Sequence, residues 1–514
     1  MEAAGALGRS SLSTYLEAIA EAVRARSRTF WIVAGLTVLA AALRFATLGV
    51  QSYHHDEIVT ASRILRGSFW HAMDAVGFSE SAPPLYYALA WLWTQMTGTG
   101  EFGLRSFSAL AGVLTVPVVF LLGNELRGRR TGIVAAALVA VNPMLVWYSQ
   151  AGRSYALLVL LTTLSLLYFT RGLEHGRRRD LTIWGVVSGL AYATHYFAIF
   201  PIAAEALWLL LRRRDAATRG LVILAAFGLL VTPLAIHQAS FGHAEWIAGH
   251  SLGHRLWEMG ITFGVGEIGD VIAQPERPLL GLVPGLAMLA ALGLLAARGE
   301  RSERLAARPV LVVAAATVGI PLVLAVLSSS KDYVLARNLL PALVPLLVAI
   351  AIGLNLRRAH RVGTLLAVVL VTYSLGFSVW ASLAPALQRP DWDSVAGAIG
   401  EPERPRAMVT WTIGQASLRY YLSTGSFQVT PAEKFDWWVG EVDFISEGPA
   451  APPPRHLLGP GFRQVSYEKA GRLYVRRYAL PGPGLRPLRL GVVARDAELG
   501  FRTNRVLLDG IGPP

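Results

Sequence analysis

The sequence of 514 residues contains no cysteine, only three lysines and few charged residues. Without cysteine, the chain can form neither disulfides nor thiolate metal sites. Charged residues make up 16% of the chain and hydrophobic residues 53%, and long apolar runs recur from Phe30 to about Trp380. Together with a mean hydropathy of +0.45, these runs indicate an integral membrane protein.

The net charge of +13 would suggest a nucleic-acid partner in a soluble protein. Here the basic residues cluster in short loops between apolar runs, as the positive-inside rule predicts for cytoplasmic loops. We therefore expect no nucleic acid, a lipid environment and a cytoplasmic N-terminus at the plasma membrane. The first run, Thr29 to Val50, is too long for a signal peptide and lacks a cleavage site, which predicts a retained signal anchor.

A transmembrane helix needs about 20 apolar residues, so the apolar runs predict a mainly α-helical, polytopic fold. Eleven spans are predicted, at residues 29–49, 103–123, 131–147, 155–170, 182–196, 197–211, 221–238, 279–297, 309–328, 339–356 and 362–382. An odd number of spans places the two termini on opposite sides of the membrane.

After Ala381 the content of proline, glycine and charge rises, and no further span follows. We expect a cytoplasmic tail at 1–28, a transmembrane catalytic domain at 29–383 and a soluble extracytoplasmic domain at 384–514. The last should be a small α/β unit. Its patterns predict helices at 391–399 and 417–422 and strands at 406–413 and 471–478.

The first outer loop reads His54-His55-Asp56-Glu57 directly after the first span. Acidic groups at a membrane interface are costly without a function, so we take Asp56 and Glu57 as candidate catalytic residues. Adjacent residues on a helix point in different directions, and only one can face a given substrate atom. Asp56 is the stronger candidate, although it could also be simply the N-cap of a helix over 57–69. Residues 83–97, too short for a span, predict a second interfacial helix.

The predicted topology brings further polar residues to the same outer face, and a cavity lined by acids and cations is the natural inference. A phosphate leaving group needs such cations, whereas a neutral solute does not. The simpler interpretation is that the arginines reach the lipid headgroups and that His195 is structural. Histidines at 237, 243, 250 and 254 share a loop with acids at 245, 258, 267 and 270, but their spacing matches no compact metal motif. The candidate substrate-binding residues are His55, Glu80, Arg153, Tyr155, His195, Tyr196, Lys331 and Arg337.

Taken in order, these residues resemble the GT-C membrane glycosyltransferases, most closely the dolichyl-phosphate-mannose-protein mannosyltransferase-like proteins of glycosyltransferase family 39. The resemblance extends from about Leu43 to Trp392. In one place the chain departs from the pattern: related sequences commonly carry a glutamate where this chain has Ala151. A second acid that helps to hold a divalent metal in related oligosaccharyltransferases is therefore missing, which implies metal-independent transfer without a cofactor. The stretches that carry the resemblance are Asp56-Glu57, Pro83-Pro84-Leu85-Tyr86-Tyr87, Arg105 to Gly112, Arg153 to Leu157, His195 to Phe197 and Arg337 to Pro341.

The resemblance implies an inverting transfer of mannose or another hexose from a polyprenyl-phosphate donor to a hydroxyl of a protein, lipid or glycan acceptor. Asp56 would be the general base, and Arg153, Arg337 and Lys331 would stabilise the departing phosphate. The alternative is a transporter or flippase of a lipid-linked or anionic solute, but transporters usually have internal repeats and ionisable groups near the membrane midplane. A receptor or scaffold whose C-terminal domain binds a partner is a third possibility.

Overall fold

The computed structural model describes residues 27–242, 247, 249, 251–267, 278–328, 332–412, 414–422, 427–429, 436–449, 452–497, 499 and 504–510. The chain forms two compact units. The first consists of Met1–Ala46, Glu80–Tyr86 and Ser106–Val379, and the second of Thr47–Ser79, Tyr87–Arg105 and Trp380–Pro514. Each unit is described by itself, and the limits predicted for the three domains remain predictions.

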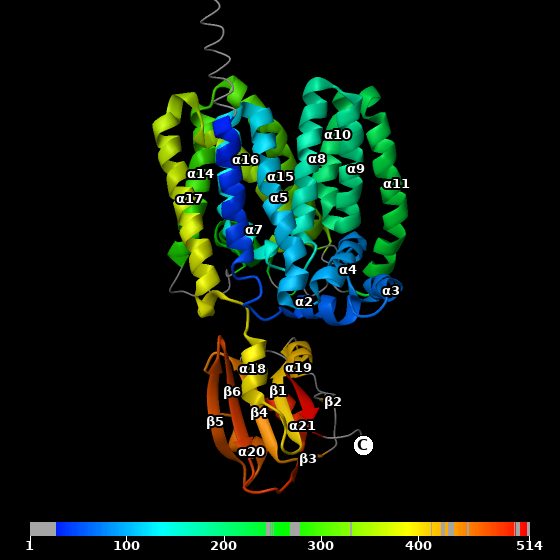
Figure 1. The fold of residues 1–514 in the computed structure, drawn as a ribbon, viewed down its shortest axis with the longest axis vertical. Coiled ribbons are helices and arrows are strands. Elements are labelled where there is room, and N and C mark those ends of the chain that lie inside the picture. Colours follow the sequence, from blue (N-terminus) through cyan, green and yellow to red (C-terminus); the bar gives the residue numbers. More distant parts are fainter. Residues whose placement is uncertain are drawn as a thin grey trace, which may run out of the picture. The chain divides into compact units, whose positions relative to one another are not determined.

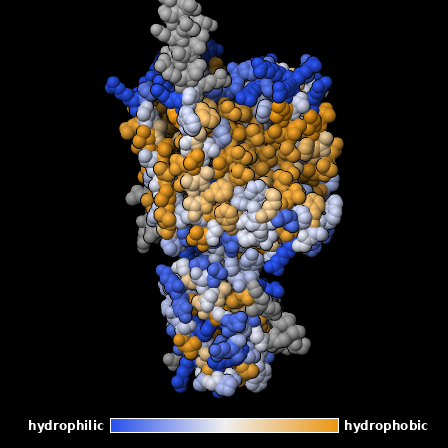
Figure 2. Space-filling model, viewed as in Figure 1, coloured by the Kyte–Doolittle hydropathy of each residue, from blue (hydrophilic) through white to orange (hydrophobic). Residues whose placement is uncertain are grey.

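Long apolar helices lie side by side in the first unit (Figure 1). Their outer surface forms an apolar band with a hydrophilic rim at one end, as expected of a multi-pass membrane protein (Figure 2). In the described residues, eight helical segments are long and apolar enough to span a membrane, or nine if the bent pair α6 and α7 counts as one. These segments are Ser27–Phe45, α5 (Glu101–Arg127), α8 (Tyr155–His175), α11 (Arg214–Ala239), α14 (Pro278–Arg298), α15 (Arg301–Leu327), η5 (Ala336–Ala342) with α16 (Leu343–Leu354), η6 (Arg357–Ala359) with α17 (His360–Leu383), and the pair α6 (Arg129–Val141) with α7 (Pro143–Ser149).

All eleven predicted spans coincide with helices, but two of these helices are shorter than the segments given above. They are α9 (Arg178–Thr194), with 17 residues, and α10 (Ile199–Arg212), with 14. The chain is extended at His195 between α9 and the short turn η2 (Tyr196–Ala198), which ends α9 early. The predicted count of eleven therefore exceeds the eight or nine that qualify. A further helix, α12 (Leu252–Val265), lies in the long loop before α14.

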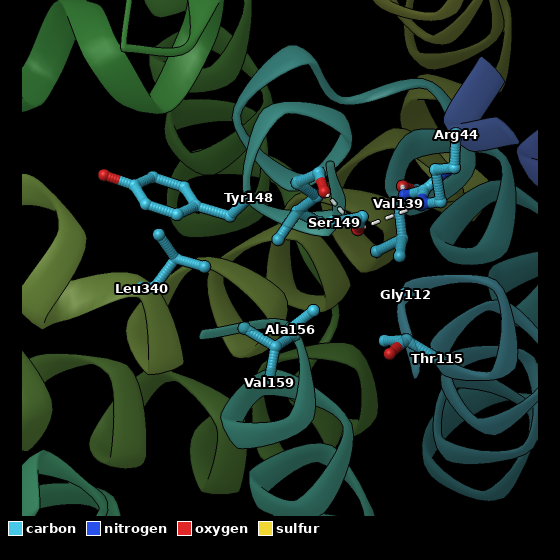
Figure 3. A pocket seen from close by; sticks show the side chains of 10 residues that line it. Arg44, Gly112, Thr115, Val139, Tyr148, Ser149, Ala156, Val159 and Leu340 are labelled. Atoms are coloured by element: carbon cyan, nitrogen blue, oxygen red, sulfur yellow. Dashed lines mark hydrogen bonds between the residues drawn. The ribbon is translucent and has the colours of Figure 1, made fainter. Parts of the chain in front are cut away.

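A buried arginine fills the 58° bend between α6 and α7. Pro143 has no N–H to give to the carbonyl of Val139, four residues before it. Arg44 donates instead to Val139 O at 3.3 Å, to Ala140 O at 2.9 Å and to Ser149 Oγ at 3.1 Å. Figure 3 shows Arg44 and Ser149 beside a small cavity that is otherwise mostly apolar. A Cβ on Gly112 would lie 2.0 Å from Ser149 Oγ, so only glycine lets α5 approach this closely.

The loops predicted to be cytoplasmic meet at one end of the helix bundle. Glu303 is buried and accepts hydrogen bonds from Arg127 Nη2 and from the backbone N–H of Arg357, both at 3.1 Å. Glu125 pairs with Arg171 at 3.1 Å and with His175 at 3.0 Å. These contacts join residues from four predicted inner loops at one end, in agreement with the predicted parity up to α17.

A carboxyl group is buried within the apolar packing of α8, α9 and α10. Glu205, on α10, is 1% exposed. Its Oε2 accepts hydrogen bonds from Trp184 Nε1 at 2.7 Å and from Ser165 Oγ at 2.5 Å, and the latter lies 2.8 Å from Ser188 Oγ. Among the described residues, no cation forms an ion pair with Glu205. The hydrogen bonds therefore replace water for this group and connect three helices.

The first outer loop, in the second unit, differs in detail from the prediction. It contains α2 (His55–Val59), the π-helical turn η1 (Thr60–Ile64) and α3 (Phe69–Ser79), and α4 (Leu85–Thr97) follows. The N-cap of α2 is His54, so the prediction that Asp56 caps a helix over 57–69 is wrong. The backbone N–H of His54 donates to Glu57 Oε2 at 2.9 Å, which starts the helix earlier, and Gly67, with φ of 90°, separates η1 from α3. The helix expected within 83–97 is confirmed as α4.

The C-terminal residues of the second unit form a six-stranded sheet in the order β2-β8-β1-β4-β6-β5, in which β1 and β4 are parallel and the other pairs antiparallel. Alternate residues of β1 contribute to two apolar cores: Met408 packs with α18 and α19, and Ala407 and Val409 pack with α20 and α21.

The predicted α/β unit is confirmed, and the elements expected at 391–399, 406–413, 417–422 and 471–478 correspond to α18, β1, α19 and β6. The bounds are η7 (Pro385–Leu387), α18 (Trp392–Ile399), β1 (Arg406–Trp411), α19 (Gly414–Leu422), β2 (Phe427–Val429), β3 (Trp437–Val439), β4 (Glu441–Glu447), α20 (Arg455–Leu458), β5 (Arg463–Ala470), β6 (Leu473–Ala479), β7 (Arg486–Leu488), α21 (Leu490–Asp496) and β8 (Asn504–Asp509), with β3 and β7 in a second, two-stranded sheet.

We predict that Glu205→Leu lowers the midpoint of thermal unfolding, whereas Glu205→Gln largely preserves it. Leucine leaves the Trp184 N–H and one hydroxyl of the Ser165–Ser188 pair buried without an acceptor, at about 1–3 kcal/mol for each unsatisfied group, whereas the glutamine amide oxygen can still accept. The measurement is the melting temperature of the purified variants in one detergent. Equal melting temperatures for the leucine variant and the wild type would contradict this role.

Candidate active site

The first cluster of candidate residues surrounds the acidic pair in the second unit. Glu57 is 1% exposed and forms a bidentate ion pair with Arg105, with Oε1 to Nε at 2.8 Å and Oε2 to Nη2 at 2.9 Å. Arg389 Nε lies 3.8 Å from Glu57 Oε2. Because both oxygens of Glu57 already accept strong hydrogen bonds, its side chain holds the loop together.

Asp56 has a different environment from its neighbour. Its side chain is 26% exposed, and Oδ1 lies 2.8 Å from His55 Nε2. The rings of His54 and His55 lie 4.2 Å apart. Packing against the protein, and then the nearby His55, lower the pKa of His54 to about 3, so that His54 is neutral near pH 7. Asp56 is therefore the accessible carboxylate of the pair and is positioned by a histidine.

The C-terminal residues of the second unit contact this loop directly. The hydroxyl of Tyr421, on α19, accepts from the backbone N–H of Tyr53 at 2.7 Å and donates to Glu101 Oε1 at 2.6 Å. Ser52 Oγ donates to Oδ1 of Asp391, the N-cap of α18, at 3.1 Å. The residues just before α2 are thus anchored by side chains more than 300 positions later in the sequence.

The second cluster lies in the first unit and contains most of the other candidates. Arg153 pairs with Glu80 through Nη1 to Oε1 at 2.8 Å and Nη2 to Oε2 at 2.6 Å. Ser108 Oγ donates to the backbone carbonyl of Arg153 at 3.1 Å and lies 3.1 Å from the hydroxyl of Tyr86. The structure thus brings the two candidates Glu80 and Arg153 together, and their charges compensate each other.

Aromatic rings line the surroundings of His195. Tyr155 lies 4.8 Å from Tyr148 and 5.6 Å from His195, measured between ring centroids. Arg153 and Arg337 both lie close enough to His195 to act on its ring electrostatically. Tyr196 points to another partner, because its hydroxyl donates to Gln238 Oε1 at 2.8 Å. Lys331 lies outside the described residues.

The sequence analysis missed a buried ion pair in this unit. Asp332 accepts from Arg255 Nη1 at 2.8 Å and from Nη2 at 2.5 Å, and Arg255 also donates to the backbone carbonyl of Val334 at 2.7 Å. These hydrogen bonds hold the pKa of Asp332 below its usual value. The only sequence signal was a lone acid directly after Lys331 in a short loop. The pair fixes the segment that leads to Arg337.

Two groups of side chains in the described part of the chain could hold a metal ion. In one, ligand atoms of His54, His55 and Asp56 lie within 4.8 Å of one another, and the other group is Glu125, Glu174 and His175. The first is well suited chemically, because neutral imidazole and carboxylate are common ligands of divalent transition metals. In the long loop between α11 and α14, His243, Glu245, His250 and Asp270 lie outside the described residues. Metal-independent transfer remains a prediction.

Residues 81–237 match the family model described as dolichyl-phosphate-mannose-protein mannosyltransferase. Two crystal structures of ArnT from Cupriavidus metallidurans are similar to most of the chain, one bound to undecaprenyl phosphate and one in the apo state. Their TM-scores are 0.52 and 0.54 at 14% and 15% identity, and the matches cover 87% and 88% of this chain and 98% of ArnT. The chain has the GT-C fold. The expected fold class is thereby confirmed.

A match to a curated relative covers only part of this chain. GPI mannosyltransferase 1 from Eremothecium gossypii is 32% identical over 119 residues, which are 22% of this chain. The match spans 26% of the length of that relative. Within the 81–237 match lie Arg153, Tyr155, His195 and Tyr196, whereas the acidic pair precedes it.

We predict that Asp332→Asn lowers the melting temperature strongly at pH 7 and much less below about pH 3.9. The folded-state pKa of Asp332 is lower than in the unfolded chain, so its stabilisation is complete above about pH 3.9 and is lost as the pH falls through the folded-state value. At pH 7, the buried Arg255 without its partner costs about 3–5 kcal/mol. Thermal unfolding at pH 7, 5 and 3 measures this, with the exposed Asp215→Asn as control. A difference from wild type that stays constant with pH would contradict the prediction.

Proposed function

We propose that this protein is an inverting glycosyltransferase of the extracytoplasmic face of the plasma membrane. It transfers mannose or another hexose from a polyprenyl-phosphate donor to a hydroxyl of a protein, lipid or glycan. The mannosyltransferase family match supports a sugar transferase, and the undecaprenyl phosphate bound to ArnT supports a polyprenyl-phosphate donor. The observation that carries the proposal is the accessible Asp56 carboxylate, held beside a buried and fully paired Glu57.

Asp56 acts as the general base in this proposal. A hydroxyl is a poor nucleophile, and a positioned carboxylate that accepts its proton contributes roughly 100-fold to 10,000-fold in rate. His55 orients the Asp56 carboxylate through the 2.8 Å contact. Glu57 holds the start of α2 in place through its ion pair with Arg105. Because Arg105 occupies both oxygens of Glu57, this carboxylate does not exchange protons with the substrate.

The departing polyprenyl phosphate needs a cation, and Arg337 is the one that we assign first. Arg337 lies near Tyr148 and His195, whose rings lie with Tyr155 in one aromatic cluster of the first unit. Arg153 and Lys331 are proposed as further phosphate contacts, and Tyr155, His195 and Tyr196 as part of the lining. The acceptor oxygen forms a bond to the anomeric carbon from the side opposite the phosphate oxygen, whose bond to that carbon breaks. A single displacement of this kind inverts the anomeric configuration.

We predict that Asp56→Asn lowers transfer by about 100-fold or more. Membranes from cells that lack the chromosomal copy are supplied with radiolabelled polyprenyl-phosphate mannose, and label in endogenous acceptors is measured. Asp74→Asn is the matched control, because Asp74 is an exposed acid on α3 in the same loop. Full transfer by folded Asp56→Asn would refute the role of general base.

We predict that Glu57→Gln lowers transfer because less protein folds, whereas Asp56→Asn lowers it because the base is lost. Removing the carboxylate leaves Arg105 buried without a counter-charge, at about 3–5 kcal/mol. We therefore expect a lower yield of folded protein and a lower melting temperature, whereas Asp56→Asn keeps both.

The metal-independent mechanism predicts that chelation of divalent metals leaves transfer by the wild type unchanged. If chelation abolished transfer, this mechanism would be wrong, and the cluster of His54, His55 and Asp56 would be the candidate metal site.

A further inference from the structure

Two apolar grooves lie on the surface of the first unit, and none of the candidate site residues lines them. One is lined by α10 and α15, which pack against each other. The other is shallow and follows α15. The two grooves share Arg308 and Val312, which lie one helical turn apart. This pair therefore separates two neighbouring apolar channels.

Arginines gather at one end of these grooves. Arg212 and Arg308 line the first groove, and Arg301, Arg304 and Arg308 line the second. All four side chains are exposed. The guanidinium of Arg308 lies 5.4 Å from the centre of the Trp208 ring, which orients it over the first groove.

These arginines have no acidic partners in the part of the chain that the structure describes. Arg304 donates only to the carbonyl of Ala296, at 3.3 Å. The one acid among them on α15, Glu303, is buried and pairs with Arg127 instead. A net positive charge thus lies beside apolar grooves, and the loops that carry it are those predicted to be cytoplasmic.

The dimensions of the first groove match one leaflet of a bilayer. Along α15 it extends from Arg308 to Ile320, which at 1.5 Å per residue is about 18 Å. Half of a hydrocarbon core about 30 Å thick is about 15 Å. An acyl chain that starts at the arginines can therefore lie in the groove over most of its length.

We propose that the two grooves bind one anionic diacyl phospholipid of the leaflet that faces the arginines. Its phosphate lies among Arg212, Arg304 and Arg308, and one acyl chain lies on either side of the pair Arg308 and Val312. Guanidinium groups favour phosphate through bidentate hydrogen bonds, and basic pockets between membrane helices recognise anionic headgroups. This site is independent of the proposed transferase chemistry.

The experiment is native mass spectrometry of the full-length protein titrated with phosphatidylglycerol, phosphatidylcholine of the same chains, lyso-phosphatidylglycerol and inorganic phosphate. We expect one tightly bound phosphatidylglycerol, with weaker binding of the other three. Arg212→Gln with Arg308→Gln should weaken phosphatidylglycerol roughly 30-fold, from about 1 kcal/mol for each arginine. Equal binding of phosphatidylcholine, or of the single-chain lipid, would overturn the proposal.

Two further variants separate the site from general effects. Arg178→Gln with Arg361→Gln removes the same charge from exposed positions that line neither groove, and should keep the affinity of the wild type. Ala204→Trp fills the first groove and keeps every arginine, so it should weaken the diacyl lipid to the level of the lyso-lipid. If the control pair lost affinity as much as the groove pair, or if Ala204→Trp had no effect, the proposed site would be wrong. Melting temperatures confirm that each variant is folded.

Discussion

The buried guanidinium of Arg105 holds the first outer loop in a single conformation. Its N–H groups donate to both oxygens of Glu57 and to the backbone carbonyls of Leu48, Gln51 and Ser52. A charge 1% exposed is tolerable only when it is paired and its donors are satisfied, and here one carboxylate and three carbonyls satisfy it. Because those carbonyls come from the residues between the first helix and α2, the path of the whole loop depends on this one side chain.

Residues that follow α17 in the second unit extend this network. Arg389 approaches the same Glu57 carboxylate, and its backbone N–H donates to Gln51 Oε1 at 3.1 Å. Together with the contacts of Ser52 and Tyr53, this makes the C-terminal sheet domain a support for the acidic loop. A transferase with a long reactive lipid donor gains from a base that does not move, because a small misplacement of a catalytic group costs much of its effect. In the proposed mechanism, these contacts would let the domain hold Asp56 in place without contacting the substrate.

The sequence predicts the helices well because length and apolarity decide them, and each of the eleven predicted spans contains one. Two of these helices, α9 and α10, have only 17 and 14 residues, and the chain is extended at His195 between them, which no local pattern predicts. The sequence also misplaces the start of α2, since the Glu57 carboxylate that caps the helix is not visible as a helix signal. Pairs such as Arg255 with Asp332 join residues 77 positions apart, and no local pattern reports such a contact.

The same geometry explains why two adjacent acids have separate duties. On a helix, neighbours point about 100° apart, so the first turn of α2 places Glu57 against Arg105 and leaves Asp56 26% exposed beside His55. Both oxygens of Glu57 accept hydrogen bonds from the buried Arg105, so neither is positioned to accept a proton from a substrate hydroxyl. Asp56 contacts His55, and its side chain remains accessible to an acceptor substrate. The ion pair that fixes the loop thus also determines which of the two acids stays accessible, as the proposed role of Asp56 requires.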